Sequence, residues 1–137
     1  MERLSTLKDK IQYRIRKSKT NTFLVNDFMD LSGRNQVLRA LKELIRQEEI
    51  VRVGKSIYTK ARRSSITGRL VPQDTLREIA IEALNKLGVN VVQTQEESNY
   101  NNRLTEQVPN ELIIGVDRPV TRNISFGKMR INYEFVN

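Results

Sequence analysis

The sequence predicts an α+β fold in two parts, and three observations support that prediction. Apolar residues recur every three or four positions in several stretches, as they do in amphipathic helices. Pairs of short β-rich segments are joined by turns that begin with glycine, as in tight hairpins. A polar stretch containing Gly68 and Pro72 separates two groups of such elements and is typical of a linker. A chain of 137 residues has room for two small domains.

Charge divides the chain at about the same place. We predict a first domain at 1–61, a basic linker at 62–72, and an α+β domain with an antiparallel sheet at 73–137. Residues 1–65 contain 16 Lys and Arg against 7 Asp and Glu, a net charge of +9. Residues 66–137 contain 8 against 9, a net charge of −1. A generally basic, solvated surface would spread its charge evenly, so this asymmetry favours a polyanionic partner for the first domain.

The first domain begins with a helix and a short connecting region. A short extended piece at Phe23–Val25 precedes a short helix, which Asn26 is placed to cap. Phe28 and Leu31 would point inward from this region. The first helix buries one stripe, formed by Leu4, Leu7, Ile11 and Ile15.

The next helix has the clearest amphipathic pattern. It follows the turn Ser32-Gly33 and runs from about Arg34 to Glu48. Two β-rich segments, IVRV and SIYT, come next, separated by Gly54-Lys55. Helix, short helix, turn, longer helix and hairpin, in that order, is the plan of the winged helix-turn-helix. The apolar face of the longer helix consists of Val37, Leu38, Leu41, Leu44 and Ile45.

That plan predicts binding to duplex DNA, with the N-terminal end of the longer helix leading into the major groove. The forked donors of Arg39 match guanine, and Asn35 or Gln36 can pair with adenine. The full set of candidates for base or groove contacts is Ser32, Arg34, Asn35, Gln36 and Arg39. Candidates for phosphate contacts, which set affinity but carry no sequence information, are Arg14, Lys17, Lys42, Arg52, Lys55, Arg62 and Arg63. The alternative is an adaptor whose winged helix binds an acidic protein instead of DNA.

The second domain gives fewer functional indications. Its helix lies in DTLREIAIEALNKLG, with Gly88 as the stop, and four β-rich segments follow, two of them joined at Gly127-Lys128. Tyr100 and Arg103, in the Asn-rich stretch SNYNNRLTEQVP, are candidates for a partner contact. The alternative for this stretch is a hydrogen-bonded loop. Dimerisation, partner binding or further DNA contact are the roles open to this domain.

Composition argues against most enzyme chemistry. The chain contains no His and no Cys, which removes imidazole bases, thiolate nucleophiles and nearly all zinc sites. Its carboxylates show no recognisable metal-ligand spacing. We therefore predict no catalytic residue, no metal and no cofactor. The start MERLSTLKDK lacks the apolar core of a secretory signal, and no apolar run has the roughly 20 residues that a membrane span needs. A cytoplasmic location is expected.

Several stretches carry a family resemblance. They are IQYRIRKSKTNTFLVNDF, QVLRALKELI, VRVGKSIYTKAR and TGRLVP, and the similarity continues through EALNKLGV and YNNRLTEQVP to the turn around Gly127. They resemble short bacterial proteins grouped with the abortive-infection AbiEi-type antitoxins of type IV toxin-antitoxin systems. The most specific part is Gln36, Val37, Arg39, Ala40 and Leu41, followed by Arg52, Gly54 and Tyr58.

The resemblance implies a repressor that binds the operator of an antitoxin-toxin operon. It also implies a nucleotidyltransferase-like toxin, encoded next door, as a partner. Two residues depart from the family pattern: Glu49 and Ser56 stand where glycines are expected on either side of the first wing strand. Both departures bear on the conformation of the wing. A homodimer on DNA is a further expectation, because one winged helix covers only a half-site.

Overall fold

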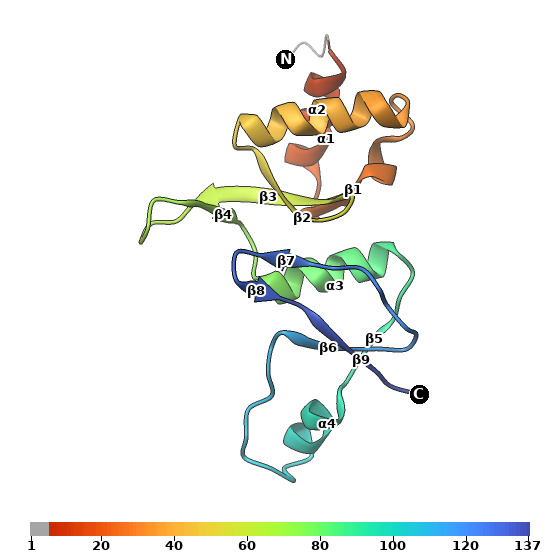
Figure 1. The fold of residues 1–137 in the computed structure, drawn as a ribbon, viewed down its shortest axis with the longest axis vertical. Helices are drawn as coiled ribbons and strands as arrows, with labels where there is room; N and C mark the ends of the chain where they lie inside the picture. The colour runs from red at the N-terminus through yellow and green to blue at the C-terminus, as the bar shows by residue number, and fades with distance from the viewer. Residues whose placement is uncertain (1–5) are drawn as a thin grey trace. The chain divides into compact units, whose positions relative to one another are not determined.

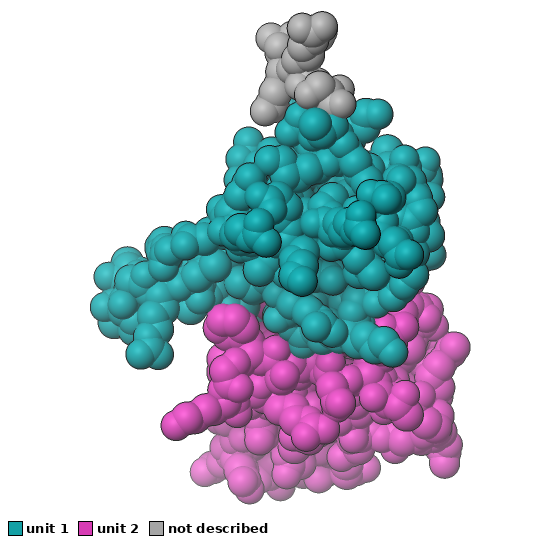
Figure 2. All heavy atoms as spheres, turned by 45° about the horizontal axis from the view of Figure 1, so that its top comes forward, with its two compact units in different colours: residues 1–75 teal, residues 76–137 magenta. Residues whose placement is uncertain are grey.

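The structure is a computed structural model that describes residues 6–137. Leu4, which the sequence places on the first helix, lies outside the described residues. The described chain has an α+β fold with four α-helices and short, mostly antiparallel sheets. It divides between Thr75 and Leu76 into two compact units, coloured separately in Figure 2. No helix within 6–137 is both long enough and apolar enough to cross a membrane.

Unit 1 places two helices on one face of a small sheet (Figure 1). The sheet has the strand order β1-β3-β2, and β4 pairs with the far end of β3. Thr6 caps the first helix by accepting a hydrogen bond from the Asp9 amide at 3.1 Å. The elements are α1 (Leu7–Lys17), β1 (Thr22–Leu24), the 3₁₀ helix η1 (Val25–Phe28), α2 (Arg34–Arg46), β2 (Ile50–Gly54), β3 (Ile57–Arg63) and β4 (Leu70–Pro72).

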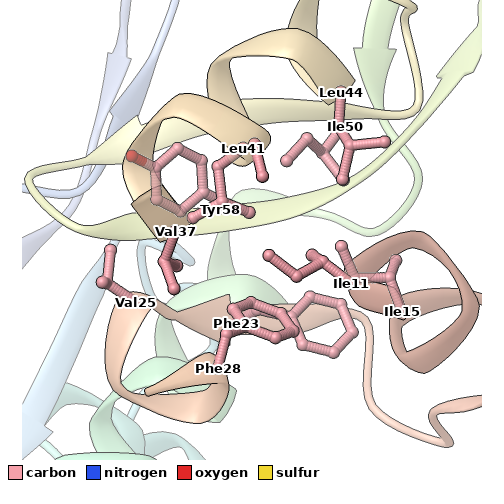
Figure 3. Packing of buried hydrophobic residues seen from close by; sticks show 11 residues of the cluster. Ile11, Ile15, Phe23, Val25, Phe28, Val37, Leu41, Leu44, Ile50 and Tyr58 are labelled. Carbon is pink, nitrogen blue, oxygen red and sulfur yellow. The ribbon is translucent and has the colours of Figure 1, made fainter. Parts of the chain in front are cut away.

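The core of unit 1 lies between α1, α2 and the sheet (Figure 3). The predicted stripes of both helices face it, with Ile11 and Ile15 from α1 buried against the apolar face of α2. Phe28 is fully buried and its ring lies 5.9 Å from that of Phe23, while Leu31 is half-buried against the same core. Asn26, however, is not the cap that we predicted. It lies inside η1, and the Asp27 carboxylate accepts from the Leu24 amide at 2.9 Å instead.

The end of α2 and the following hairpin differ in detail from the prediction. The Glu48 backbone has a positive φ of 63° and the Glu49 amide donates to the Leu44 carbonyl at 3.0 Å, which is a Schellman-type stop. The left-handed residue is thus Glu48, not Glu49. A bulge between Arg52 and Gly54 shifts the β2–β3 turn to Lys55 and Ser56, and Ser56 has a φ of 62°.

The predicted linker is the largest correction in unit 1. Residues 62–72 are not an irregular connection, because they hold the end of β3 and all of β4, with Arg62 opposite Val71 and Arg63 opposite Leu70. Apolar and polar residues do not alternate in this stretch, as they do in a half-buried strand. The hairpin forms nevertheless, because main-chain hydrogen bonds pair its two strands. The boundary between the units therefore lies at Thr75 and Leu76, after this hairpin.

Unit 2 is built on α3 and a three-stranded sheet. The predicted stop is confirmed: Gly88 has a φ of 78° and the Val89 amide donates to the Leu84 carbonyl at 2.9 Å. Gly115 on β6 has no room for a side chain, since a Cβ there would lie 2.4 Å from the Val92 carbonyl oxygen. The elements are α3 (Leu76–Lys86), β5 (Val91–Val92), α4 (Gln95–Asn101), β6 (Ile113–Val116), β7 (Ser125–Phe126), β8 (Met129–Arg130) and β9 (Asn132–Phe135).

Two features of unit 2 depart from the prediction. The sheet is mixed, because β5 pairs antiparallel with β6 but β9 pairs parallel with it. The segment between β6 and β9 carries the β7–β8 hairpin and returns the chain to the start of the sheet, as parallel pairing requires. The Asn-rich stretch is not all loop either, since its first residues belong to α4. Thr94 and Glu97 form a capping box at the start of this helix.

Candidate nucleic-acid interface

The solvent-facing side of α2 is polar and largely unpartnered. Asn35, Gln36, Arg39 and Lys42 are exposed, and their side chains make no hydrogen bond or ion pair to any other described residue. Gly33 occupies the N-cap without a side-chain bond, and the first turn contains no acidic residue. The free amides and the positive end of the helix dipole thus favour an anionic group at this end.

The β2–β3 turn is fastened to the same end of α2. The Arg34 guanidinium donates to the Ser56 hydroxyl at 2.9 Å, which ties the first residue of the helix to the turn. Lys55 is exposed beside Ser56. The Arg52 Nε donates to the Gly54 carbonyl at 3.0 Å, so the fork of Arg52 is held along the hairpin. Ser32 lies half-buried in the turn before the helix.

The structure gives Arg14 a partner inside the protein. Its guanidinium donates to both carboxylate oxygens of Asp30, at 2.6 and 2.9 Å, and to the Asp27 carbonyl at 2.8 Å. The hydrogen bond from Arg14 lowers the pKa of the Asp30 carboxyl below its ordinary value. Arg14 therefore fastens α1 to the turn before α2, and this role explains it better than a phosphate contact.

Lys17 keeps its charge on the surface. Its Nζ lies 5.7 Å from the centre of the Tyr13 ring, a cation–π contact, and Tyr13 is itself exposed. The two residues line a shallow hollow of about 560 Å³ together with Lys10, Arg14 and Leu31. The sequence places Lys10 among the cations of the first helix that can hold phosphates, but it did not single out Tyr13, which lies three positions on and on the same face of α1.

Arg62 and Arg63 have different surroundings on the β3–β4 hairpin. Arg63 pairs with the Glu48 carboxylate and donates to the Gly68 carbonyl at 3.1 Å. It therefore braces the hairpin against the end of α2. Arg62 is exposed, with only a 3.5 Å contact to the Arg63 carbonyl.

The predicted contact residues of unit 2 lie at the end of α4. Tyr100 is 41% exposed, and the Arg103 backbone has a positive φ of 60° with its amide donating to the Tyr100 carbonyl at 3.0 Å. Both line a shallow pocket of about 550 Å³. Tyr100 and Arg103 are thus accessible to a partner. They belong to unit 2, whereas the basic candidates for DNA contact belong to unit 1.

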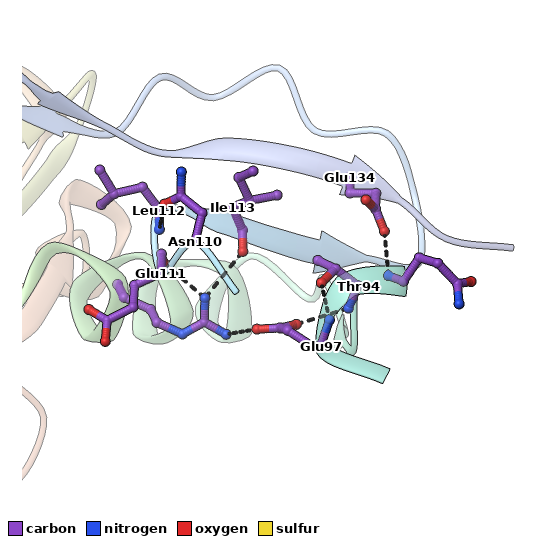
Figure 4. A network of polar contacts seen from close by, with 9 residues as sticks. Thr94, Glu97, Asn110, Glu111, Leu112, Ile113 and Glu134 are labelled. Carbon is purple, nitrogen blue, oxygen red and sulfur yellow. Dashed lines mark hydrogen bonds and ion pairs between the residues drawn. The ribbon is translucent and has the colours of Figure 1, made fainter. Parts of the chain in front are cut away.

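A polar network holds α4 to the rest of unit 2 (Figure 4). The Arg77 guanidinium donates to Glu97 at 2.7 Å and to the carbonyls of Glu111 and Ile113 at 2.9 and 3.2 Å. The Gln95 amide donates to the Glu134 carboxylate at 2.9 Å. These contacts are internal and explain Arg77 as a structural residue. In residues 6–137 no three acidic side chains gather as ligands for a metal ion.

Comparison of the whole chain with protein-family models finds a match to a family of unknown function named DUF6088, over residues 7–136. The chain belongs to this family. No curated protein and no solved structure matches it. Because the match runs from α1 to β9, both units are part of what defines DUF6088.

In this DUF6088 chain the solvent-facing side of α2 brings unpartnered polar side chains together beside the hairpin turn. They comprise amide, guanidinium and ammonium groups, which are donors suited to base edges and phosphates. Arg14 and Arg63, by contrast, are occupied by internal carboxylates. The predicted contact residues are therefore of two kinds: the α2 side chains are accessible to a ligand, whereas Arg14 and Arg63 form ion pairs within the protein.

Proposed function

We propose that the chain is a DNA-binding transcriptional repressor, with unit 1 acting as a winged helix-turn-helix. The observation that carries the proposal is the unpartnered row Asn35, Gln36, Arg39 and Lys42 on α2, with the hairpin turn bonded to the start of the same helix. In this proposal α2 enters the major groove and the β2–β3 hairpin is the wing. The chain has a binding role and is not an enzyme.

Each group has a role that follows from its chemistry. Arg39 donates two parallel hydrogen bonds to guanine, and Asn35 or Gln36 pairs with adenine. Lys42, Arg52, Lys55 and Lys17 neutralise phosphates, which fixes the register of α2 on the duplex. Arg34 acts through Ser56, because its bond to that hydroxyl holds the wing beside the leading end of the helix.

We further propose that the repressor is the antitoxin of a toxin-antitoxin operon. This step rests on the resemblance to the AbiEi-type antitoxins at Gln36, Val37, Arg39, Ala40 and Leu41, and it implies a nucleotidyltransferase-like toxin as the second partner. Unit 2 would bind this partner or a second copy of the chain on DNA, with Tyr100 and Arg103 in the contact. A repressor of this kind acts on the chromosome in the cytoplasm.

The test is selection of duplexes from a random pool by the full chain. We expect enrichment of a defined site, and we expect the variant Asn35→Ala/Gln36→Ala/Arg39→Ala to lose the enrichment while it keeps weak binding through its remaining cations. All three side chains are exposed, so the variant should fold, and circular dichroism verifies this. An Arg118→Ala variant, altered at an exposed arginine of unit 2, is the matched control. Binding to acidic proteins with no affinity for duplex DNA would favour the adaptor instead.

A further inference from the structure

The β3–β4 hairpin forms an arm that projects from the body of unit 1 (Figure 1, Figure 2). We define the arm as residues 61–72, with Ala61 opposite Pro72 at its base and Arg63 opposite Leu70 near its tip. Arg63 braces the arm by its ion pair with Glu48, just after α2. The arm is thus attached to the end of the proposed recognition helix, and it does not act as a flexible linker.

The tip of the arm is held by hydrogen bonds of its own. The Ser64 hydroxyl accepts from the amides of Ile66 and Thr67, each at 3.2 Å, and the Ser64 carbonyl accepts from the Gly68 amide at 2.9 Å. Gly68 has a φ of 73°, which closes the turn. This framework presents the Ile66 side chain to solvent, with 92% of its surface exposed.

A single exposed isoleucine is common on protein surfaces and does not by itself indicate a binding site. The residues around Ile66 indicate what it could bind. Residues 60–73 contain four cations and no acidic residue. Arg62 and Arg69 lie on one face of the arm, because side chains alternate along paired strands and the Ser64 amide donates to the Arg69 carbonyl at 2.8 Å. Arg69 has no side-chain partner in the described part of the chain. An apolar tip between two arginines is suited to the minor groove of DNA, where proteins insert arginine and wedge apolar side chains between base pairs.

The dimensions of unit 1 agree with such a contact. The proposed wing and the tip of the arm lie at opposite ends of β3. Arg34, at the start of α2, is bonded to Ser56 of the wing, and Glu48, just after α2, is bonded to Arg63 of the arm. Ten residues lead from Ser56 to Ile66. An extended strand of that length spans at most about 33 Å, and the helical repeat of B-DNA is about 34 Å. The two tips therefore lie within one helical repeat of each other, so both can contact the same duplex.

We propose that the arm is a second DNA contact, in which Arg62 and Arg69 enter the minor groove and Ile66 wedges between base pairs and bends the duplex. This rests on the proposed DNA-binding function. The wedge adds little sequence preference of its own, because it acts by unstacking a step, and flexible pyrimidine–purine steps yield most easily.

The test uses the full chain and a 40-base-pair duplex selected by the wild type from a random pool, with a fluorescent donor and acceptor at its two ends. Wild type should bring the ends together, by a bend of about 20° or more. Ile66→Ser should bind the duplex with at most half of that change in energy transfer. Arg62→Gln/Arg69→Gln should weaken binding about threefold to tenfold and lower the salt slope by about two.

Leu104→Ser in unit 2 is the matched control, because Leu104 is also a strongly exposed apolar residue, and it should behave as wild type. Thermal melting verifies that all variants fold. Suppose that the wild type binds DNA and the α2 triple variant loses the site preference. If both arm variants then match the wild type in affinity and in bend, the arm proposal alone is wrong. If the wild type binds no duplex, the DNA-binding function and the arm proposal are both wrong.

Discussion

At the scale of single residues, the exposed cations of unit 1 differ in what they can do to DNA. Arg39 carries five N–H donors in a planar fork, which matches the two acceptors on a guanine edge. Lys55, on the hairpin turn, carries a compact ammonium that attracts any phosphate within reach. The two residues are therefore expected to act on different properties of binding, specificity for Arg39 and overall affinity for Lys55.

We predict that Arg39→Ala costs about 1–3 kcal/mol of binding free energy on the preferred duplex and much less on random DNA. Lys55→Ala should weaken binding to both duplexes and lower the salt slope by about one. Titrations of the two DNAs at several salt concentrations measure these differences. Equal losses on both DNAs for Arg39→Ala would make it a phosphate contact and not a reader of bases.

The sequence predicted which polar residues of α2 are exposed better than it predicted which basic residues are paired. Asn35, Gln36 and Arg39 were predictable because helical periodicity places them opposite the apolar stripe. The ion pairs of Arg14 and Arg63 were not predicted, because their partners Asp30 and Glu48 lie 16 and 15 positions away and only the fold brings them together. A basic residue in a sequence shows its charge, but it does not show whether that charge is already paired.

The ion pair between Arg16 and Glu49 predicts a dependence of stability on pH. The hydrogen bond from Arg16 lowers the pKa of Glu49 below its ordinary value of 4.5. The Glu49 carboxyl therefore binds its proton less tightly in the folded protein than in the unfolded chain. The pair adds to the free energy of unfolding above pH 4.5, and this contribution is lost as the pH falls through the lowered pKa.

Arg16→Gln should reduce the free energy of unfolding at pH 7 by about 1 kcal/mol or less, as expected for an exposed pair. The difference from wild type should shrink at pH values below 4.5, where Glu49 takes up its proton. Urea unfolding at a series of pH values tests this, with Lys42→Gln as a control that removes an unpaired cation. A difference that stays constant down to about pH 2.5 would show that the ion pair does not cause it.

At the scale of elements, the long amphipathic helices were predicted closely and the short elements were not. The helix α4 begins with Thr94 and Glu97 in the spacing of a capping box, so its start was recognisable in the sequence. The arm and the parallel pairing of β6 with β9 were not recognisable. Both depend on which distant strands meet, and local composition does not determine that.

The turn after α4 offers a direct test of backbone strain. Arg103 has a φ of 60°, a region that costs non-glycine residues about 1 kcal/mol or more. Arg103→Gly should therefore raise the melting temperature of the chain, whereas Arg103→Ala, which keeps the Cβ, should not. Differential scanning calorimetry measures both variants. Equal melting temperatures for the two variants would show that the backbone conformation carries no cost here.

At the scale of the whole molecule, the chain joins a basic unit to a nearly neutral one. One winged helix covers a single half-site, and specific repression usually needs two, spaced by about 10 base pairs or a multiple. The charge on unit 2 opposes the approach of a second copy only weakly, since residues 76–137 contain 7 Lys and Arg against 8 Asp and Glu, a net charge of −1. Unit 2 is therefore the part of the chain expected to bring two copies together on DNA.

Hydroxyl-radical footprinting on the selected duplex, extended on both sides with unrelated flanking DNA, tests paired occupancy. We expect two protected half-sites related by an inverted or direct repeat at saturating protein. The α2 triple variant is the control, and it should protect neither half-site. A single protected half-site would leave unit 2 without a role in assembly on DNA.

Unit 1 is expected to neutralise DNA phosphates, and the salt dependence of duplex binding measures how many. Binding that displaces condensed counterions loses affinity in proportion to the number of phosphates contacted. With Lys17, Lys42, Arg52, Lys55 and the arm in contact, we predict a slope of about −4 or steeper for log affinity against log salt concentration between about 50 and 200 mM. A slope near zero, or no binding to duplex DNA at the lowest salt concentration, would show that unit 1 does not bind DNA through its phosphates.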